Sequence, residues 1–164
     1  MRDMTLFDIP IAGLDGTTDL LARHRGNPLL IVNVASGCAL AADQYPALEA
    51  LAQRHRADGL VVVGVPCNQF GEQEPGTAEE ITAQCAVRRI TFPHTEKTEV
   101  NGAGRHPLYT ALTPLADAEG HTGDVRWNFE KFLVSGVGHP VGRFAPTVGP
   151  EDGDLLKAVR AQLR

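Results

Sequence analysis

This sequence has no long apolar run, few aromatic side chains and no excess of positive charge. No stretch approaches the ~20 consecutive apolar residues that a membrane-spanning helix needs, which argues against a membrane protein. Basic residues number 15 against 20 acidic ones, and aromatic residues make up 5% of the chain. A nucleic-acid-binding protein needs a basic face or aromatic stacking platforms, so the composition disfavours that class as well.

Cysteine is also scarce, with three residues in 164. An odd number cannot pair completely, which excludes a full disulfide framework. The N-terminal residues lack the apolar core of a secretory signal, which predicts a cytoplasmic protein, and there cysteines are more often free or catalytic than structural. The six histidines show no spacing typical of zinc. We therefore expect them at the surface or in loops, and we expect no metal and no cofactor.

The order of apolar segments predicts a single α/β domain over residues 1–164. Continuous apolar runs at residues 27–34 and 60–65 are typical of buried strands, and an amphipathic pattern at residues 40–56 indicates a helix between them. Strand, helix and strand in this order favour a right-handed crossover with two parallel strands. No G-x-G-x-x-G motif follows either strand, so a thioredoxin-like fold is favoured over a Rossmann unit.

The remaining segments complete a central mixed sheet flanked by helices. Thr77 and Glu80 have the spacing of a capping box, which predicts a helix that begins at Ala78 and ends near Val87. The other predicted elements are an N-terminal β-hairpin or edge strand at residues 5–14, a helix at 107–115, an antiparallel hairpin of strands at 129–134 and 141–145, and a helix at 151–163.

Cys38 is the first candidate for chemistry, because it lies between a predicted strand and a predicted helix. Unpaired N–H groups and the helix dipole at such a turn lower a thiol pKa and favour the reactive thiolate. Position alone also fits a small buried side chain at a strand end, as free cysteines often are.

Three separated blocks surround this position, and together they resemble the glutathione peroxidase family. The blocks are residues 33–38 (NVASGC), residues 66–75 (PCNQFGEQEP) and residues 126–133 (RWNFEKFL). They occur in the family's order, and smaller matches extend the resemblance over nearly the whole chain. Gly37 stands where the family often has lysine, which removes one nearby cation.

The resemblance implies a catalytic set of Cys38, Gln73, Trp127 and Asn128. A thiolate that cleaves a peroxide becomes a sulfenic acid, and the amide and indole N–H groups can stabilise the sulfur anion or the peroxide oxygens without a metal. Taken one at a time, these side chains also fit ordinary structural roles: a core tryptophan, a solvated loop glutamine and a turn asparagine.

Cys85 matches the place where cysteine-type family members carry a resolving thiol. It would attack the Cys38 sulfenic acid and form a disulfide, although the two residues are 47 positions apart. Because the Cα atoms must come within ~7 Å, we expect local unfolding of the Cys85 helix. An inert helix cysteine is the alternative. Cys67 is expected to be a buried thiol at a strand end without a redox role.

The sequence therefore predicts an enzyme, a thiol peroxidase that reduces hydrogen peroxide and organic hydroperoxides. Cys85 favours thioredoxin, or else glutathione, as the reductant. By the same resemblance, the short stretch at residues 112–126 lacks the loop through which tetrameric members assemble, which favours a monomer. Two other functions stay open: a peroxide sensor that relays oxidation to a partner protein, and a non-catalytic thioredoxin-fold binding module.

Overall fold

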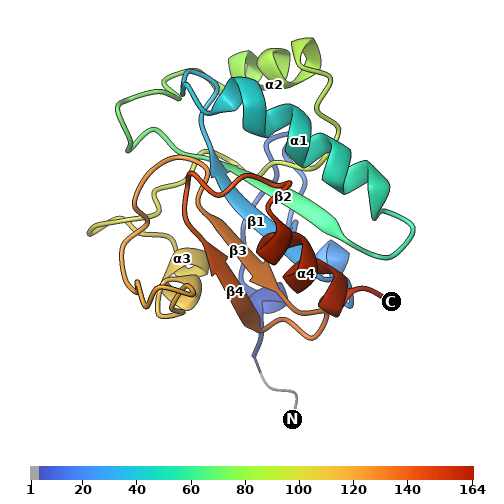
Figure 1. Cartoon of the computed structure of the whole chain (residues 1–164). Helices are drawn as coiled ribbons and strands as arrows, with labels where there is room; N and C mark the ends of the chain where they lie inside the picture. Colours follow the sequence, from blue (N-terminus) through green and yellow to red (C-terminus); the bar gives the residue numbers. More distant parts are fainter. Residues whose placement is uncertain (1–3) are drawn as a thin grey trace.

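The structure is a computed structural model that describes residues 4–164 (Figure 1). Within that range the chain forms one four-stranded sheet in the order β2-β1-β3-β4. β1 pairs in parallel with β2 and antiparallel with β3, and β3 pairs antiparallel with β4, so the sheet is mixed as expected. The strands are β1 (Leu29–Val34), β2 (Val61–Pro66), β3 (Lys131–Val134) and β4 (Pro140–Phe144).

The crossover from β1 to β2 runs through α1 (Ala41–Arg54), which confirms the predicted strand, helix and strand. Every residue of β1 is buried, as its uninterrupted apolar sequence predicts for a central strand. Its side chains alternate between the two faces: Leu29 and Ile31 enter one core cluster, whereas Leu30 and Val32 enter the other. The sheet is therefore covered on both faces.

Two layers of helices provide this cover. α1 and α4 (Gly153–Gln162) contribute to the core on one face, and Figure 1 shows them on the same side of the sheet. α3 (Pro107–Leu112) and the 3-10 helix at Leu6–Asp8 contribute to the core on the other face. A second 3-10 helix spans Ala22–His24. No helix in residues 4–164 is long and apolar enough to cross a membrane.

α2 (Ala78–Val87) packs differently from the other long helices. Its N-terminus carries the predicted capping box, since the Thr77 side chain accepts from the Glu80 N–H and Glu80 accepts from the Thr77 N–H. Only Ile81 of its ten residues is buried. A helix with so few buried contacts opens at a lower free energy than the sheet beneath it.

The predicted N-terminal β-hairpin is wrong. The chain does turn back on itself, because the Leu20 N–H bonds to the Ile11 carbonyl, but it forms a 3-10 helix and one isolated bridge between Gly13 and Thr95 in place of paired strands. The Asp8 side chain accepts from the Thr5 N–H and so stabilises a turn where the prediction had a strand. Local side-chain bonds of this kind compete with sheet formation.

Candidate active site

Three segments meet at one edge of the sheet, where β1 and β2 end and β3 begins. The first two strands are parallel, so the loops that follow them leave the sheet side by side. β3 is antiparallel to β1, and residues just before it return to the same edge. The Phe129 N–H donates to the Asn33 carbonyl at 2.7 Å, and Asn33 Nδ2 donates to the Trp127 carbonyl at 3.0 Å. Residues 127–129 are thereby fixed beside the end of β1.

Cys38 lies in the turn between β1 and α1, which we call the Cys38 turn (residues 36–41). Its side chain is buried, and its carbonyl accepts from the Ala41 N–H at the start of α1. One residue earlier, the Gly37 N–H donates to the Gln73 carbonyl at 3.0 Å. A Cβ atom on Gly37 would lie 2.9 Å from that carbonyl oxygen, so a side chain there would push the two loops apart. The close approach explains why glycine occupies this position.

A buried carboxylate joins the same two loops. The Ser36 N–H and hydroxyl donate to the two oxygens of Glu74 at 3.1 and 2.6 Å, and the Glu74 side chain is almost fully buried. Burial raises the Glu74 pKa above its ordinary value, and the two bonds from Ser36 act in the opposite direction. On the α2 side of this pair is a cavity of about 520 Å³, lined by Ser36, Glu74 and helix residues including Ile81.

Gln73 and Asn128 contact each other directly across two loops. Asn128 Nδ2 lies 2.9 Å from Gln73 Oε1 and 3.4 Å from the Phe70 carbonyl. A carbonyl can only accept, so Asn128 presents its NH₂ group here and Gln73 presents its oxygen. Gln73 Nε2 then has no hydrogen-bond partner among residues 4–164 and is left to donate elsewhere. Asn128 is fully buried, and its Oδ1 is an unsatisfied acceptor among the same residues.

Trp127 is half-exposed, with 39% of its surface accessible, whereas a tryptophan that belonged to the core would be mostly buried. Its ring lies 5.7 Å from that of Phe70. The Trp127 and Gln73 side chains both come within about 3.3 Å of the place where a Cβ on Gly71 would be. Gly71 also has a φ of +68°, which favours glycine. The indole N–H has no partner in the described part of the chain, so it is free to donate.

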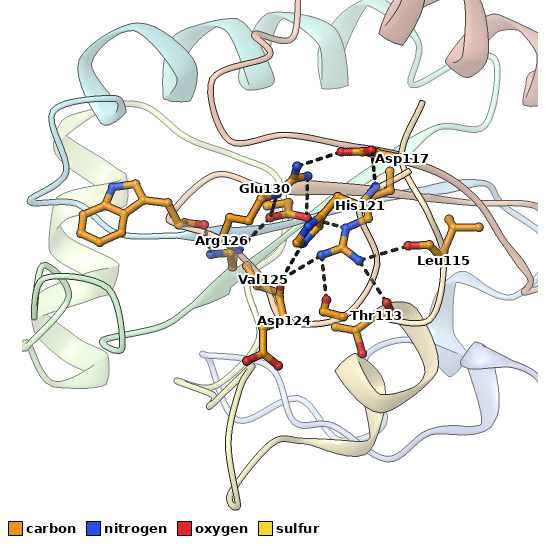
Figure 2. A network of polar contacts seen from close by, with 12 residues as sticks. Thr113, Leu115, Asp117, His121, Asp124, Val125, Arg126 and Glu130 are labelled. Carbon is orange, nitrogen blue, oxygen red and sulfur yellow. Dashed lines mark hydrogen bonds and ion pairs between the residues drawn. The ribbon is translucent and has the colours of Figure 1, made fainter. Parts of the chain in front are cut away.

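Arg126 and Glu130, which flank Trp127 and Asn128 in the sequence, belong to an ionic network that Figure 2 shows together with Asp117. Glu130 is fully buried and binds both Arg126 and Arg143, and Arg126 also pairs with Asp117 at 2.8 Å. The Arg143 guanidinium donates to four backbone carbonyls, those of Thr113, Leu115, Gly123 and Asp124.

This support accompanies a strained residue. Phe129 has a φ of +69°, an outlier for a bulky side chain. Such outliers persist only where the surrounding structure over-determines them, and they are frequent at functional sites.

Cys85 lies on α2 and is only partly buried. Its Sγ is 3.6 Å from Nε2 of His94, and burial raises the pKa of the thiol to about 11. Cys38, Cys67 and Cys85 are all free thiols in this structure, so Cys85 is not joined to Cys38. Cys67 is buried at the end of β2, as expected, with Gln69 Oε1 3.5 Å from its sulfur.

Two features of the site were missed by reasoning from the sequence. The histidines were expected at the surface or in loops, but His55 and His94 are buried. Arg88 was also missed, and its guanidinium donates to the Ser36 carbonyl at 3.0 Å and lies 3.4 Å from the Ala41 carbonyl. Arg88 therefore binds both ends of the Cys38 turn. No local pattern marks either contact, because each joins segments that are distant in the sequence.

Comparisons with known proteins identify the family of the chain. The profile of the family described as glutathione peroxidase matches residues 6–113. The chain is 41% identical to the thioredoxin/glutathione peroxidase BtuE of Escherichia coli (strain K12), over 99% of each protein. It is 42% identical to the hydroperoxy fatty acid reductase gpx1 of Synechocystis sp., over 90% of each protein.

Solved structures lead to the same group. The crystal structure of T. cruzi GPX1 superposes with a TM-score of 0.76 at 30% identity, covering 97% of this chain and 96% of that one. A thioredoxin family protein from Chlorobium tepidum TLS superposes with a TM-score of 0.66 at 16% identity, covering 99% and 97%. That second similarity concerns the fold alone, which is thioredoxin-like.

Proposed function

The chain belongs to the glutathione peroxidase family and is a peroxidase, and we propose that it reduces hydrogen peroxide and organic hydroperoxides through Cys38. One observation carries the proposal. The bond from Asn128 turns Gln73 so that its NH₂ group is left to donate, and the backbone of the same Gln73 is bonded to Gly37, next to the proposed nucleophile. The unpartnered indole N–H of Trp127 is a further donor, and the Trp127 ring lies beside the Gln73 side chain against Gly71.

In the first step the Cys38 thiolate attacks one peroxide oxygen. The O–O bond breaks, the sulfur is oxidised to a sulfenic acid, and the other oxygen leaves as an alkoxide or hydroxide that takes up a proton. Donors fixed in advance around the developing negative charge lower this barrier. Gln73 and Trp127 are neutral at every pH of interest, so their role is to hold charge and not to transfer protons. Asn128, whose NH₂ group is bonded to Gln73 and to the Phe70 carbonyl, orients the Gln73 amide.

In the second step Cys85 resolves the sulfenic acid. Its sulfur attacks the Cys38 sulfur, the disulfide forms, and the hydroxyl group of the sulfenic acid leaves as water with the proton of the Cys85 thiol. The free Cys85 thiol sits on α2, the long helix with only one buried residue. Opening of this helix supplies the movement that the step requires.

One dithiol or two monothiols then return both cysteines to thiols and are themselves oxidised to a disulfide. The Escherichia coli relative is named as a thioredoxin/glutathione peroxidase, and the Synechocystis relative as a reductase of hydroperoxy fatty acids. We accordingly propose thioredoxin as the donor, glutathione as the weaker one, and fatty acid hydroperoxides among the substrates. We further propose that the enzyme acts in the cytoplasm as a monomer.

The test is a peroxide turnover assay with thioredoxin, its reductase and NADPH, run beside one with glutathione and its reductase. Cys38→Ser should abolish turnover in both. Cys85→Ser should consume one equivalent of peroxide and then stop in the thioredoxin assay. Recycling of Cys85→Ser at the wild-type rate would refute the resolving role. A single turnover of the wild-type protein followed by a stable mixed disulfide with another protein would favour a peroxide sensor.

A further inference from the structure

The His94 ring packs against a glycine of β2. A Cβ atom on Gly64, in the middle of β2, would lie 2.7 Å from two atoms of the His94 imidazole. The ring stacks on Phe92 with centroids 5.1 Å apart and on Tyr45 at 6.1 Å. Glycine inside a strand weakens the strand and commonly marks the close approach of another group. Here the approaching group is an imidazole, 8% exposed, that the peroxide chemistry described above does not use.

The hydrogen bonds of this ring fix its tautomer. His94 Nδ1 lies 3.1 Å from the carbonyl of Phe92, and because a carbonyl only accepts, Nδ1 must carry the proton. Nε2 is then an acceptor. Two donors face it: the Tyr45 hydroxyl oxygen at 3.2 Å and the Cys85 sulfur at 3.6 Å.

The pair of His94 and Cys85 is neutral and does not become a thiolate and an imidazolium. Burial lowers the pKa of His94 to about 4 and raises the pKa of Cys85 to about 11, so transfer of the thiol proton to the ring is strongly disfavoured. The charged groups around the pair are Glu49, Glu74 and Arg88, and they leave both shifts in place. The thiol therefore keeps its hydrogen and, together with the Tyr45 hydroxyl, shares the acceptor nitrogen Nε2.

This bond is one of few contacts that hold the C-terminal end of α2. Ile81 is the one buried residue of the helix. Beyond Cys85 the chain is held by Arg88, which contacts the Ser36 and Ala41 carbonyls and the face of the Tyr45 ring. A hydrogen bond from Cys85 to the sheet therefore stabilises the closed helix in particular.

We propose that His94 is a positioning residue that retains the reduced Cys85 thiol on the sheet through the S–H···Nε2 bond and so limits the rate at which α2 opens. The inference rests on the proposed role of Cys85 as resolving thiol. When α2 opens, the thiol leaves with its proton, Nε2 keeps the bond from Tyr45, and the proton ends in the water released with the disulfide. His94 thus acts on the resolving step and leaves the attack by Cys38 unchanged.

Two variants of His94 separate the bond from the packing. His94→Phe keeps a flat ring between Tyr45 and Phe92 and removes the acceptor, whereas His94→Gln places an amide oxygen near the position of Nε2. Hydrogen exchange is measured in a Cys38→Ser background, in which no disulfide forms. The reporters are the Arg88 and Ile90 amides, which bond to the Gln84 and Cys85 carbonyls. We expect His94→Phe to speed their exchange roughly two- to tenfold, the equivalent of one neutral hydrogen bond, and His94→Gln to restore most of the protection.

Amides of β1 serve as the control, and equal acceleration there and in α2 would overturn the proposal, because His94 would then act through global stability. Unchanged protection of α2 in His94→Phe would overturn it as well.

The same variants with Cys38 intact are mixed with one equivalent of peroxide, and the disulfide is followed by acid quench, alkylation and mass spectrometry. We expect it to form roughly two- to tenfold faster in His94→Phe. A slower reaction would show that His94 acts as a base and would overturn the proposal. If the disulfide forms in none of the proteins, the resolving role fails, and the exchange data alone then decide whether His94 retains Cys85.

Discussion

The two cysteines proposed to react lie in opposite kinds of surroundings. The Cys38 turn is bonded to the loop after β2 through Gly37 and Ser36, and three side chains that donate N–H groups come from loops anchored to the sheet. Cys85 lies on a helix with one buried residue in ten and contacts His94 through a single long bond. Many contacts hold the Cys38 turn and its surrounding loops, which we call the rigid corner. Few contacts hold the part of the molecule around Cys85 and His94, which we call the flexible corner.

The difference follows from what each thiol is proposed to do. Stabilising charge in a transition state requires donors whose positions are set beforehand, because their reorganisation would raise the barrier. Forming a disulfide with a residue on another element requires movement, and a segment that opens at low free energy supplies it. The fold meets both needs by placing Cys38 where strands end and Cys85 on a sparsely packed helix.

The sharpest test of the rigid corner is Gln73→Ala. The backbone carbonyl that binds Gly37 stays, and Asn128 keeps the Phe70 carbonyl as an acceptor, so the variant removes the donating NH₂ group with little change in structure. We expect the rate of Cys38 oxidation by peroxide to fall by ~10²–10³, about 2.7–4 kcal/mol, as for the loss of one preorganised donor in other enzymes. Stopped-flow or competition kinetics with peroxide measures this rate.

The matched control for this variant is Gln84→Ala, which removes an exposed amide from α2. It should leave peroxide oxidation at the wild-type rate. Once the sulfenic acid has formed, Gln73→Ala should resolve it to the disulfide as fast as the wild-type protein does. Slow resolution in Gln73→Ala would break the comparison, because the two corners would then be coupled.

Much of this architecture is predictable from the sequence because its signals are local. Apolar runs predict β1 and β2, and the spacing of Thr77 and Glu80 predicts the start of α2 to the residue. The N-terminal hairpin failed because side-chain bonds from Asp8 stabilise a 3-10 helix that no periodicity reveals.

The residues of the candidate site likewise divide into those that the sequence reveals and those that it does not. Resemblance to a family supplied Cys38, Gln73, Trp127 and Asn128, and the structure adds that Asn128 bonds to the Gln73 oxygen and so leaves the Gln73 NH₂ group free. His94 and Arg88 could not be predicted, because their partners lie on other elements of the fold. The signal for His94 was the glycine inside an otherwise β-branched strand, Gly64, whose meaning depends on knowing which ring it faces.

The flexible corner should also be the more sensitive to acid. Burial lowers the pKa of His94 from 6.5 to about 4, so the folded protein resists a proton that the unfolded chain accepts. This contribution to the free energy of unfolding is therefore complete above pH 6.5 and is lost as the pH falls towards 4. We expect a loss of about 1–3 kcal/mol over this range that is absent from His94→Phe, measured by urea denaturation of both proteins at several pH values. Parallel curves would contradict a buried neutral His94.

The smallest expected effect comes from the far end of the same helix. Thr77→Ala removes the exposed capping box of α2 and should cost about 1 kcal/mol of helix stability. Because a short helix forms and opens cooperatively, we expect α2 to open about fivefold more often, with faster exchange at Ile90 and faster disulfide formation. Thr82→Ala is the control, since it removes a hydroxyl bonded to the Ala78 carbonyl on the exposed face and introduces a better helix former, and it should speed neither rate. Faster exchange confined to the first turn of Thr77→Ala, with disulfide formation at the wild-type rate, would show that only the last turn of α2 has to open for Cys85 to move.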